Sequence, residues 1–244
     1  MKNIKTLLIA LATAANMLIC SCDQGVTSSD TIPEPKSKAA LQAATAPDTT
    51  GGSKGADWPQ WGGSSHNNMA SAEKGIPLEM DPGKKKKGSE EIDLATTKNV
   101  KWVAKIGSQS YGTPTVGEGK VLIGTNNESP RDSNHQGDRG IVMCFDEQDG
   151  SFLWQLVIPK LGAGKVSDWE YLGVCSSPLI HKGRAYFISN RCKVVCIDME
   201  GMSNGNDGPF KDEAKFMATG GKVVQPGKGD GDVIWVYDMR EELG

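Results

Sequence analysis

The chain has 244 residues, and its 27 basic and 30 acidic side chains leave a formal net charge of −3. This near balance gives no electrostatic reason to expect a nucleic-acid partner. The 30 glycines, 12 prolines and 6% aromatic residues favour short strands joined by many turns, and the length fits one sizeable domain or two small ones.

Residues 1–22 have the features of an export signal. Lys2 and Lys5 precede an apolar run that is too short to span a bilayer comfortably. The run ends in Leu18-Ile-Cys-Ser-Cys22, which resembles a bacterial lipobox with Cys22 as the lipidated residue. We therefore expect a lipoprotein signal peptide that leaves the chain membrane-anchored at the periplasmic side of the cell envelope. An ordinary secretory signal peptide is the alternative.

Residues 23–56 are rich in Ser, Thr, Ala, Pro, Gly and Lys and contain almost no large apolar side chains. Such a segment cannot bury enough surface to offset its ordering entropy, so we expect a disordered tether. The folded part is expected at 57–244. It begins with Asp57-Trp-Pro-Gln-Trp61, which predicts an aromatic anchor packed on the body, with a ligand platform as the alternative. Four lysines after Gly83 indicate a solvated loop and leave contact with anionic lipid headgroups open.

The stretch Gly140–Val157 predicts a β-hairpin, because β-branched and aromatic residues flank an Asp-Gly turn. The same pattern recurs downstream. The matching segments are Val142-Met-Cys-Phe-Asp146 with Val194-Val-Cys-Ile-Asp198, Ser151-Phe-Leu-Trp154 with Asp232-Val-Ile-Trp235, and Gly112-Thr-Pro-Thr-Val with Ser176-Ser-Pro-Leu-Ile. Two copies of one four-stranded unit are therefore expected, at about 99–157 and 172–239.

Two insertions interrupt these units, at 126–139 in the first and at 202–230 in the second. Insertions at loop positions of a fixed strand scaffold are common places for function. The segment Val100–Ile106 is expected to be the outer strand of a preceding unit.

The hairpin sequence ending in Asp146-Glu-Gln-Asp-Gly150-Ser-Phe-Leu-Trp154 is similar to the repeat of β-propellers that resemble pyrroloquinoline quinone (PQQ) enzymes. The resemblance covers about 57–244 and implies an all-β fold, a β-propeller of PQQ-like or WD-like four-stranded blades. Propellers have about four to eight blades, whereas about two are visible here. We therefore expect an incomplete propeller, the N-terminal part of a longer one.

The resemblance also implies roles for five residues. Asp146 and Asp198 would cap the hairpin turns, Gly150 would supply the turn conformation, and Trp154 and Trp235 would dock between neighbouring blades. In the second unit the turn glycine is displaced to position 201.

The remaining cysteines do not define a reaction centre. Cys144 and Cys196 occupy equivalent strand positions, which favours core packing. A bridge between Cys175 and Cys192 stays open, with buried free thiols as the alternative. The sequence contains neither an adjacent Cys-Cys pair nor a Cys-x-x-Cys-His haem motif, and we predict no metal site.

The first insertion contains a charged cluster made of Arg131, Asp132, His135, Asp138 and Arg139. It is the best candidate for a recognition loop, although an ion-paired surface loop explains the same residues.

These observations predict a non-catalytic, lipid-anchored β-propeller that serves as a protein-interaction or binding scaffold in the cell envelope. Its expected partners are envelope proteins and, through the anchor, the membrane, but no nucleic acid, and no cofactor is predicted. The alternative is a PQQ-dependent alcohol dehydrogenase that uses PQQ with calcium. The propeller resemblance implies the fold without deciding between these functions.

Overall fold

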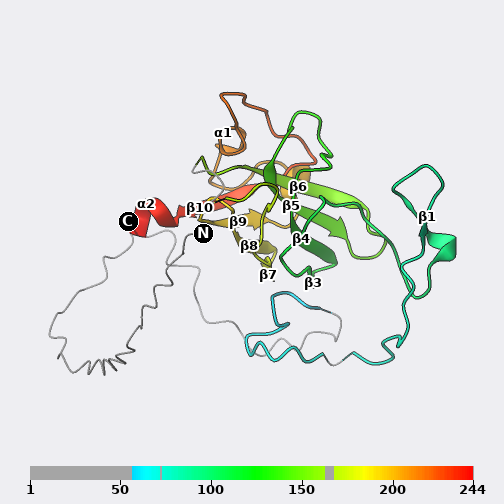
Figure 1. Ribbon diagram of the computed structural model, residues 1–244. Helices are drawn as coiled ribbons and strands as arrows, with labels where there is room; N and C mark the ends of the chain where they lie inside the picture. Colours follow the sequence, from blue (N-terminus) through cyan, green and yellow to red (C-terminus); the bar gives the residue numbers. More distant parts are fainter. Residues whose placement is uncertain (1–56, 72, 163–167, 244) are drawn as a thin grey trace, which may run out of the picture. The chain divides into compact units, whose positions relative to one another are not determined.

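The computed structural model describes residues 57–71, 73–162 and 168–243. The expected signal peptide, Cys22 and the expected tether lie outside the described residues. The described part is built on two four-stranded antiparallel sheets, and its helices are short (Figure 1). None of the helices in the described ranges is long and apolar enough to cross a membrane.

The first sheet has the strand order β3-β4-β5-β6, in which each strand pairs with the next one along the chain. Its strands are β3 (Thr115–Gly117), β4 (Lys120–Asn126), β5 (Arg139–Asp146) and β6 (Phe152–Pro159). Residues 140–145 of β5 are all buried, so this strand is covered on both faces. A continuous run of large apolar side chains is typical of such a strand.

The second sheet repeats this arrangement, with the order β7-β8-β9-β10 along the same antiparallel meander. Its strands are β7 (Leu179–His181), β8 (Arg184–Ile188), β9 (Lys193–Asp198) and β10 (Val233–Asp238). The two four-stranded units predicted from the repeat are therefore present, and both are antiparallel. No closed propeller forms from the described residues.

Both units begin with the same tight turn. Glu118 and Gly119 join β3 to β4 with φ angles of 55° and 76°, and Lys182 and Gly183 join β7 to β8 with 50° and 73°. Two successive residues with positive φ are characteristic of the type I′ turn, whose twist matches that of the paired strands. The Glu118 carboxylate accepts hydrogen bonds from the Gly183 amide at 3.1 and 2.9 Å, which connects the two turns.

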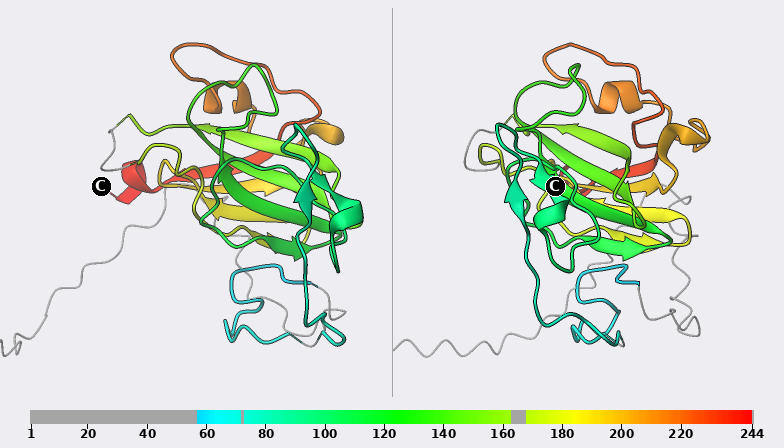
Figure 2. Two further views of the ribbon diagram at one scale, coloured as in Figure 1. Left: turned by 45° about the vertical axis from the view of Figure 1, so that its right-hand side comes forward. Right: turned by 90° about the vertical axis from the view of Figure 1, so that its right-hand side faces the viewer.

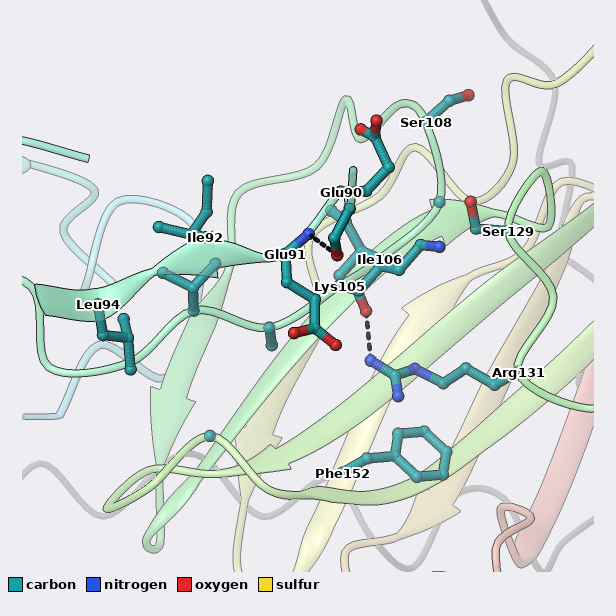
Figure 3. A pocket seen from close by; sticks show the side chains of 15 residues that line it. Glu90, Glu91, Ile92, Leu94, Lys105, Ile106, Ser108, Ser129, Arg131 and Phe152 are labelled. Atoms are coloured by element: carbon teal, nitrogen blue, oxygen red, sulfur yellow. Dashed lines mark hydrogen bonds between the residues drawn. The ribbon is translucent and has the colours of Figure 1, made fainter. Parts of the chain in front are cut away.

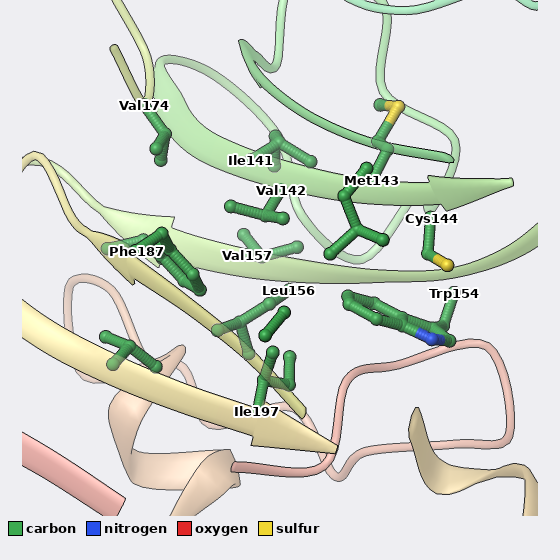
Figure 4. Packing of buried hydrophobic residues seen from close by; sticks show 14 of the residues in the cluster. Ile141, Val142, Met143, Cys144, Trp154, Leu156, Val157, Val174, Phe187 and Ile197 are labelled. Atoms are coloured by element: carbon green, nitrogen blue, oxygen red, sulfur yellow. The ribbon is translucent and has the colours of Figure 1, made fainter. Parts of the chain in front are cut away.

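The core lies between the two sheets. Leu156 of β6 and Ile197 of β9 lie close together there (Figure 4), and both are fully buried against Gly231. Apolar side chains from all the longer strands complete the cluster. The main contributors are Leu122, Val142, Trp154, Leu156, Phe187, Val195, Ile197 and Val233.

The segment at 57–61 joins both sheets. Trp58 exchanges backbone hydrogen bonds with Val116 at 2.7 and 2.9 Å, and the Pro59 carbonyl accepts one from Ile180 at 2.7 Å. Trp61, in contrast, is 56% exposed. The segment is therefore joined to the body through its backbone, the half-buried Trp58 ring lies against Gly63 of the same segment, and the packing of an aromatic anchor on the body stays a prediction.

A small hairpin precedes the first sheet. It consists of β1 (Lys84–Lys85) and β2 (Ile92–Asp93), followed by the 3₁₀ helix η2 (Leu94–Thr96). The basic run after Gly83 lies in this hairpin. Lys85 pairs with Glu90, and Lys86 pairs with Glu91 at 3.0 Å.

The two insertions lie side by side in both views of Figure 2. The second contains the 3₁₀ helix η3 (Gly201–Ser203) and the short helix α1 (Glu213–Phe216), and a second short helix, α2 (Met239–Leu243), follows β10. The Lys222 side chain donates to the Asn134 carbonyl at 3.2 Å, which connects the two insertions directly.

One expected strand is absent. Residues 100–106 form no strand of either sheet, so the prediction of an outer strand there was wrong. Alternate side chains of this segment, Trp102, Ala104 and Ile106, pack against the first sheet, which explains why its sequence pattern resembles that of a strand. Side-chain packing holds the segment in place, without a ladder of backbone hydrogen bonds.

Candidate functional site

Two tryptophans use one geometry to join consecutive units. The Trp102 indole donates to the Glu147 carbonyl at 3.0 Å, and the Trp154 indole donates to the Met199 carbonyl at 2.9 Å. Each acceptor is the residue directly after the hairpin aspartate of the following unit. The spacing from tryptophan to acceptor is 45 residues in both cases. Consecutive units are therefore joined through the same tryptophan-to-carbonyl hydrogen bond in both places.

The turn that receives each tryptophan is also repeated. Asp146 accepts from the amide of Gln148, and Asp198 accepts from the amide of Glu200, both at 2.7 Å. These are Asx turns, in which the side chain replaces a backbone acceptor. We refer to the two hairpin turns that start at Asp146 and Asp198 as the Asp turns.

A glycine lets the ring approach each Asp turn closely. Gly150 has a φ of 71°, and a Cβ atom there would overlap the Trp102 ring. Gly201 has a φ of 56°, and its Cβ would lie 2.7 Å from the Trp154 ring. The displaced glycine of the second unit therefore keeps the same place beneath the ring.

Trp235 holds the third copy of this position but has a different environment. It packs at a tilt against Tyr186 of its own sheet, with ring centroids 6.1 Å apart, and it is only partly buried. Its indole N–H makes no hydrogen bond within the described residues. No Asp turn in the described ranges lies beneath it, because the two that exist already hold Trp102 and Trp154.

Trp235 belongs to an apolar surface on the side of the second sheet that faces away from the first. We call this surface the docking face. It consists of Leu179, Tyr186, Ile188, Val194, Cys196, Trp235 and Tyr237. Leu179 is 37% and Ile188 48% exposed, whereas Cys196 is buried beneath its neighbours and the other four are half-buried, so the surface is partly open to solvent.

The corresponding face of the first sheet is completely covered. The residues at the same ladder positions are Thr115, Leu122, Gly124, Val142, Cys144, Trp154 and Leu156. All seven are buried against the second sheet. The docking face therefore repeats, on an open surface, a set of positions that elsewhere in this chain receives a neighbouring sheet.

The candidate recognition loop divides into two groups in the structure. Arg131, Asp132 and His135 lie near the second insertion, where the Asp132 carboxylate is 3.9 Å from the His135 ring. Asp138 and Arg139 belong elsewhere, at the start of β5. The loop thus does not form the single charged cluster that sequence proximity suggests.

Asp138 takes part in a structural network at the other end of the first sheet. It accepts from the Tyr171 amide at 2.7 Å and lies 3.4 Å from the ammonium group of Lys160. Lys160 also pairs with the buried Asp168 at 2.5 Å, and Asp168 accepts from Asn190 of the second unit at 3.0 Å. These contacts join the end of β6 to the second sheet.

The four cysteines in the described ranges are free thiols. Cys144 and Cys196 are buried, and burial raises the pKa of Cys144 to about 12. Such a thiol is a poor nucleophile at neutral pH. Cys175 and Cys192 are exposed and unbridged. No group of three or more His, Cys, Asp or Glu side chains in the described part of the chain is arranged to hold a metal ion.

Sequence reasoning located the hairpins but missed the docking face, although a signal was present. Tyr186, Ile188 and Val194 alternate along their strands with the core residues Ala185, Phe187 and Val195. Alternate residues of a strand point to opposite faces of the sheet. A strand with apolar residues on both faces is therefore either covered on both or carries an open interaction surface.

These features define a class of molecule: an all-β chain of two antiparallel four-stranded sheets joined in the manner of propeller blades. No family model matches the chain, and no curated protein matches it. Among solved structures, the chain is similar to the quinohemoprotein alcohol dehydrogenase ADHIIG from Pseudomonas putida HK5. The identity is 15% and the TM-score 0.26, over 52% of this chain and 19% of that one. A likeness at this level carries no argument about activity.

Proposed function

We propose that this protein is a non-catalytic interaction scaffold of the cell envelope whose docking face binds a partner sheet that carries its own Asp turn. The open docking face supports this proposal. It repeats the positions through which the first sheet binds the second, and it presents Trp235 with an unused indole donor. No described residue covers this apolar surface, and contiguous apolar surfaces of this kind mark interaction sites.

The internal docking geometry specifies the partner's chemistry. Trp102 and Trp154 both bind a carbonyl that follows a hairpin aspartate, above a glycine. A partner that fits Trp235 must offer the same turn together with an apolar sheet face. The described part of a second copy does not fit, because both Asp turns there already hold Trp102 and Trp154.

The lipid anchor at Cys22 and the place of the protein at the periplasmic side of the envelope are parts of the same proposal. They rest on the sequence of residues 1–22. No observation in the described residues favours the PQQ-dependent dehydrogenase, so we do not advance it as a second function.

Site-specific photocrosslinking in the producing cells tests this proposal. A benzophenone side chain replaces Ile188 at the centre of the docking face or, as a control, Val223 in the second insertion, which is 54% exposed. We expect the Ile188 probe to give an adduct whose peptide contains an Asp turn, meaning an aspartate followed closely by glycine in a hairpin. An adduct yield equal to that of the control would contradict the proposal, as would an adduct with the docking face of a second copy.

A further inference from the structure

A second surface, remote from the docking face, surrounds Arg131. Its guanidinium lies over the Phe152 ring, 4.7 Å from the centroid, and 5.4 Å from that of Phe145. Arg131 also donates to the backbone carbonyl of Lys105 (Figure 3). Stacking on two rings and one carbonyl bond hold the guanidinium in a fixed orientation.

Most of the donors on this guanidinium remain unused. An arginine side chain has five N–H donors, and the Lys105 carbonyl takes one of them. Within the described ranges, no carboxylate lies at ion-pair distance from Arg131. Burial lowers the pKa of Arg131, but an arginine stays protonated at neutral pH. The side chain therefore presents a preorganised positive charge that lacks a partner anion.

The guanidinium lies at one end of a cleft of about 990 Å³. Figure 3 shows Ile92 of the small hairpin, Leu94 of η2 and Ile106 around the space, with Phe152 beneath Arg131. Val103 also lines the cleft, and Leu94 and Val103 are 50% and 49% exposed. Ser89, Ser108 and Ser129 line the cleft as well, so apolar side chains and polar groups that can orient a ligand lie together, as they do in small-molecule sites.

The other charged residues that line the cleft are of both signs. Glu90 and Glu91 are paired with lysines of the small hairpin, and Lys105 also lines the cleft. Arg131 is thus the charged group whose donors remain open to a ligand. A carboxylate matches its planar fork, which can donate two parallel hydrogen bonds to the two oxygens.

A second, smaller cavity also borders Arg131 and Phe152. This cavity has a volume of about 330 Å³ and is lined by Asp132, Asn134, Gln155 and Asp230. The buried side-chain oxygen Oε1 of Gln155 has no hydrogen-bond partner in the described part of the chain. An apolar group placed against these polar atoms would leave them desolvated, which favours the larger cleft for the apolar body of a ligand.

We infer that the cleft binds a monocarboxylate with an apolar body, the carboxylate held by Arg131 and the body lying along Ile92, Leu94 and Ile106. The inference does not depend on the scaffold proposal, because it concerns the other sheet and a different class of ligand. In this inference Arg131 binds the carboxylate of the ligand, and the small hairpin forms one side of the binding cleft.

Calorimetric titration of the full-length protein tests the inference, with decanoate below its micelle concentration as the probe. The neutral comparison is 1-decanol, which has the same chain length. Decanoate should bind saturably at one site, and decanol at least tenfold more weakly. In Arg131→Gln the decanoate affinity should fall roughly ten- to hundredfold, the loss expected for charge-assisted hydrogen bonds. Arg131→Lys should be intermediate, because it keeps the charge without the fork.

Arg191→Gln is the matched control, since Arg191 also donates to a lysine carbonyl, that of Lys160, at 2.8 Å. It should leave decanoate binding unchanged. Glu91→Gln keeps Arg131 intact and should strengthen binding severalfold by removing a negative charge. Equal affinity for decanoate and decanol would overturn the inference, as would equal losses in the Arg131 and Arg191 variants. The comparison of the two probes on the unaltered protein holds even if a variant does not fold.

Discussion

Replacing Trp154 by alanine should remove a large part of the stability of this fold. The side chain is 1% exposed, and a buried tryptophan contributes roughly 150–250 Å² of contact area. At about 25 cal/mol per Å² this is roughly 4–6 kcal/mol. Loss of the bond to the Met199 carbonyl adds about 1–3 kcal/mol if that group stays buried, whereas partial collapse of the cavity offsets some of the cost. We predict a net loss of about 4–6 kcal/mol, against a usual domain stability of about 5–15 kcal/mol.

Urea unfolding followed by circular dichroism measures this loss. With a slope of about 2 kcal/mol per M, the midpoint should fall by roughly 2–3 M. Trp235→Ala is the informative control, because it occupies the same repeat position without a covering sheet. Its expected cost is only about 1–2 kcal/mol. If Trp154→Ala does not fold at all, Trp154→Phe keeps most of the ring and should lose about 1–3 kcal/mol. Equal midpoints for the alanine variants at 154 and 235 would refute the docking argument.

Three further predictions concern other parts of the chain. Gly150→Ala should destabilise the fold by several kcal/mol because of the overlap with the Trp102 ring, whereas Gly183→Ala, which has a similar φ and no neighbour within 4 Å, should cost only about 1 kcal/mol in urea melts. Burial raises the pKa of Asp232 to about 6, so the folded chain keeps a proton that the unfolded chain releases above about pH 4. Stability should therefore fall as the pH rises from about 4 to 6, by at most about 3 kcal/mol, and this fall should be smaller in Asp232→Asn; identical pH profiles of the thermal midpoint would count against it. Finally, Cys22→Ser should move the protein from the membrane fraction to the soluble fraction, because stable anchoring needs acyl chains buried in lipid; unchanged fractionation would speak against the lipobox.

The repeated hairpins could be predicted from sequence because their signals are local. Alternating apolar residues, an aspartate before each turn and a tryptophan after it define both units without knowledge of the tertiary structure. The interior of each insertion could not be predicted in this way. Gln155 donates to the Gly229 carbonyl at 2.9 Å and accepts from Gly231 at 2.9 Å, so the second insertion is held by the edge strand of the other unit. The two partners of such a contact are far apart in the sequence, so the local pattern of apolar residues does not predict it.

The candidate site shows the same division between local and distant information. The charged residues of the first insertion are neighbours in sequence. In the structure, however, Arg131 donates to the Lys105 carbonyl, whereas Asp138 accepts from the Tyr171 amide. Arg131 was identified as a charged loop residue, but its cleft requires the small hairpin and the segment at 103–108. Those parts come from different stretches of the chain, so only the folded structure brings them together.

The unequal lengths of the two long hairpins suggest an order of assembly. Five residues, 147–151, separate β5 from β6, whereas 34 residues, 199–232, separate β9 from β10. Closing the longer loop costs roughly 1.7 kcal/mol more in chain entropy, by the logarithmic dependence on loop length. The first sheet should therefore form early, and β10 should pair late, on a template already made by β7, β8 and β9. Trp235 arrives with β10, so the docking face is completed only after the other three strands of its sheet have paired, and a partner that reads Trp235 can bind only a sheet whose four strands are in place.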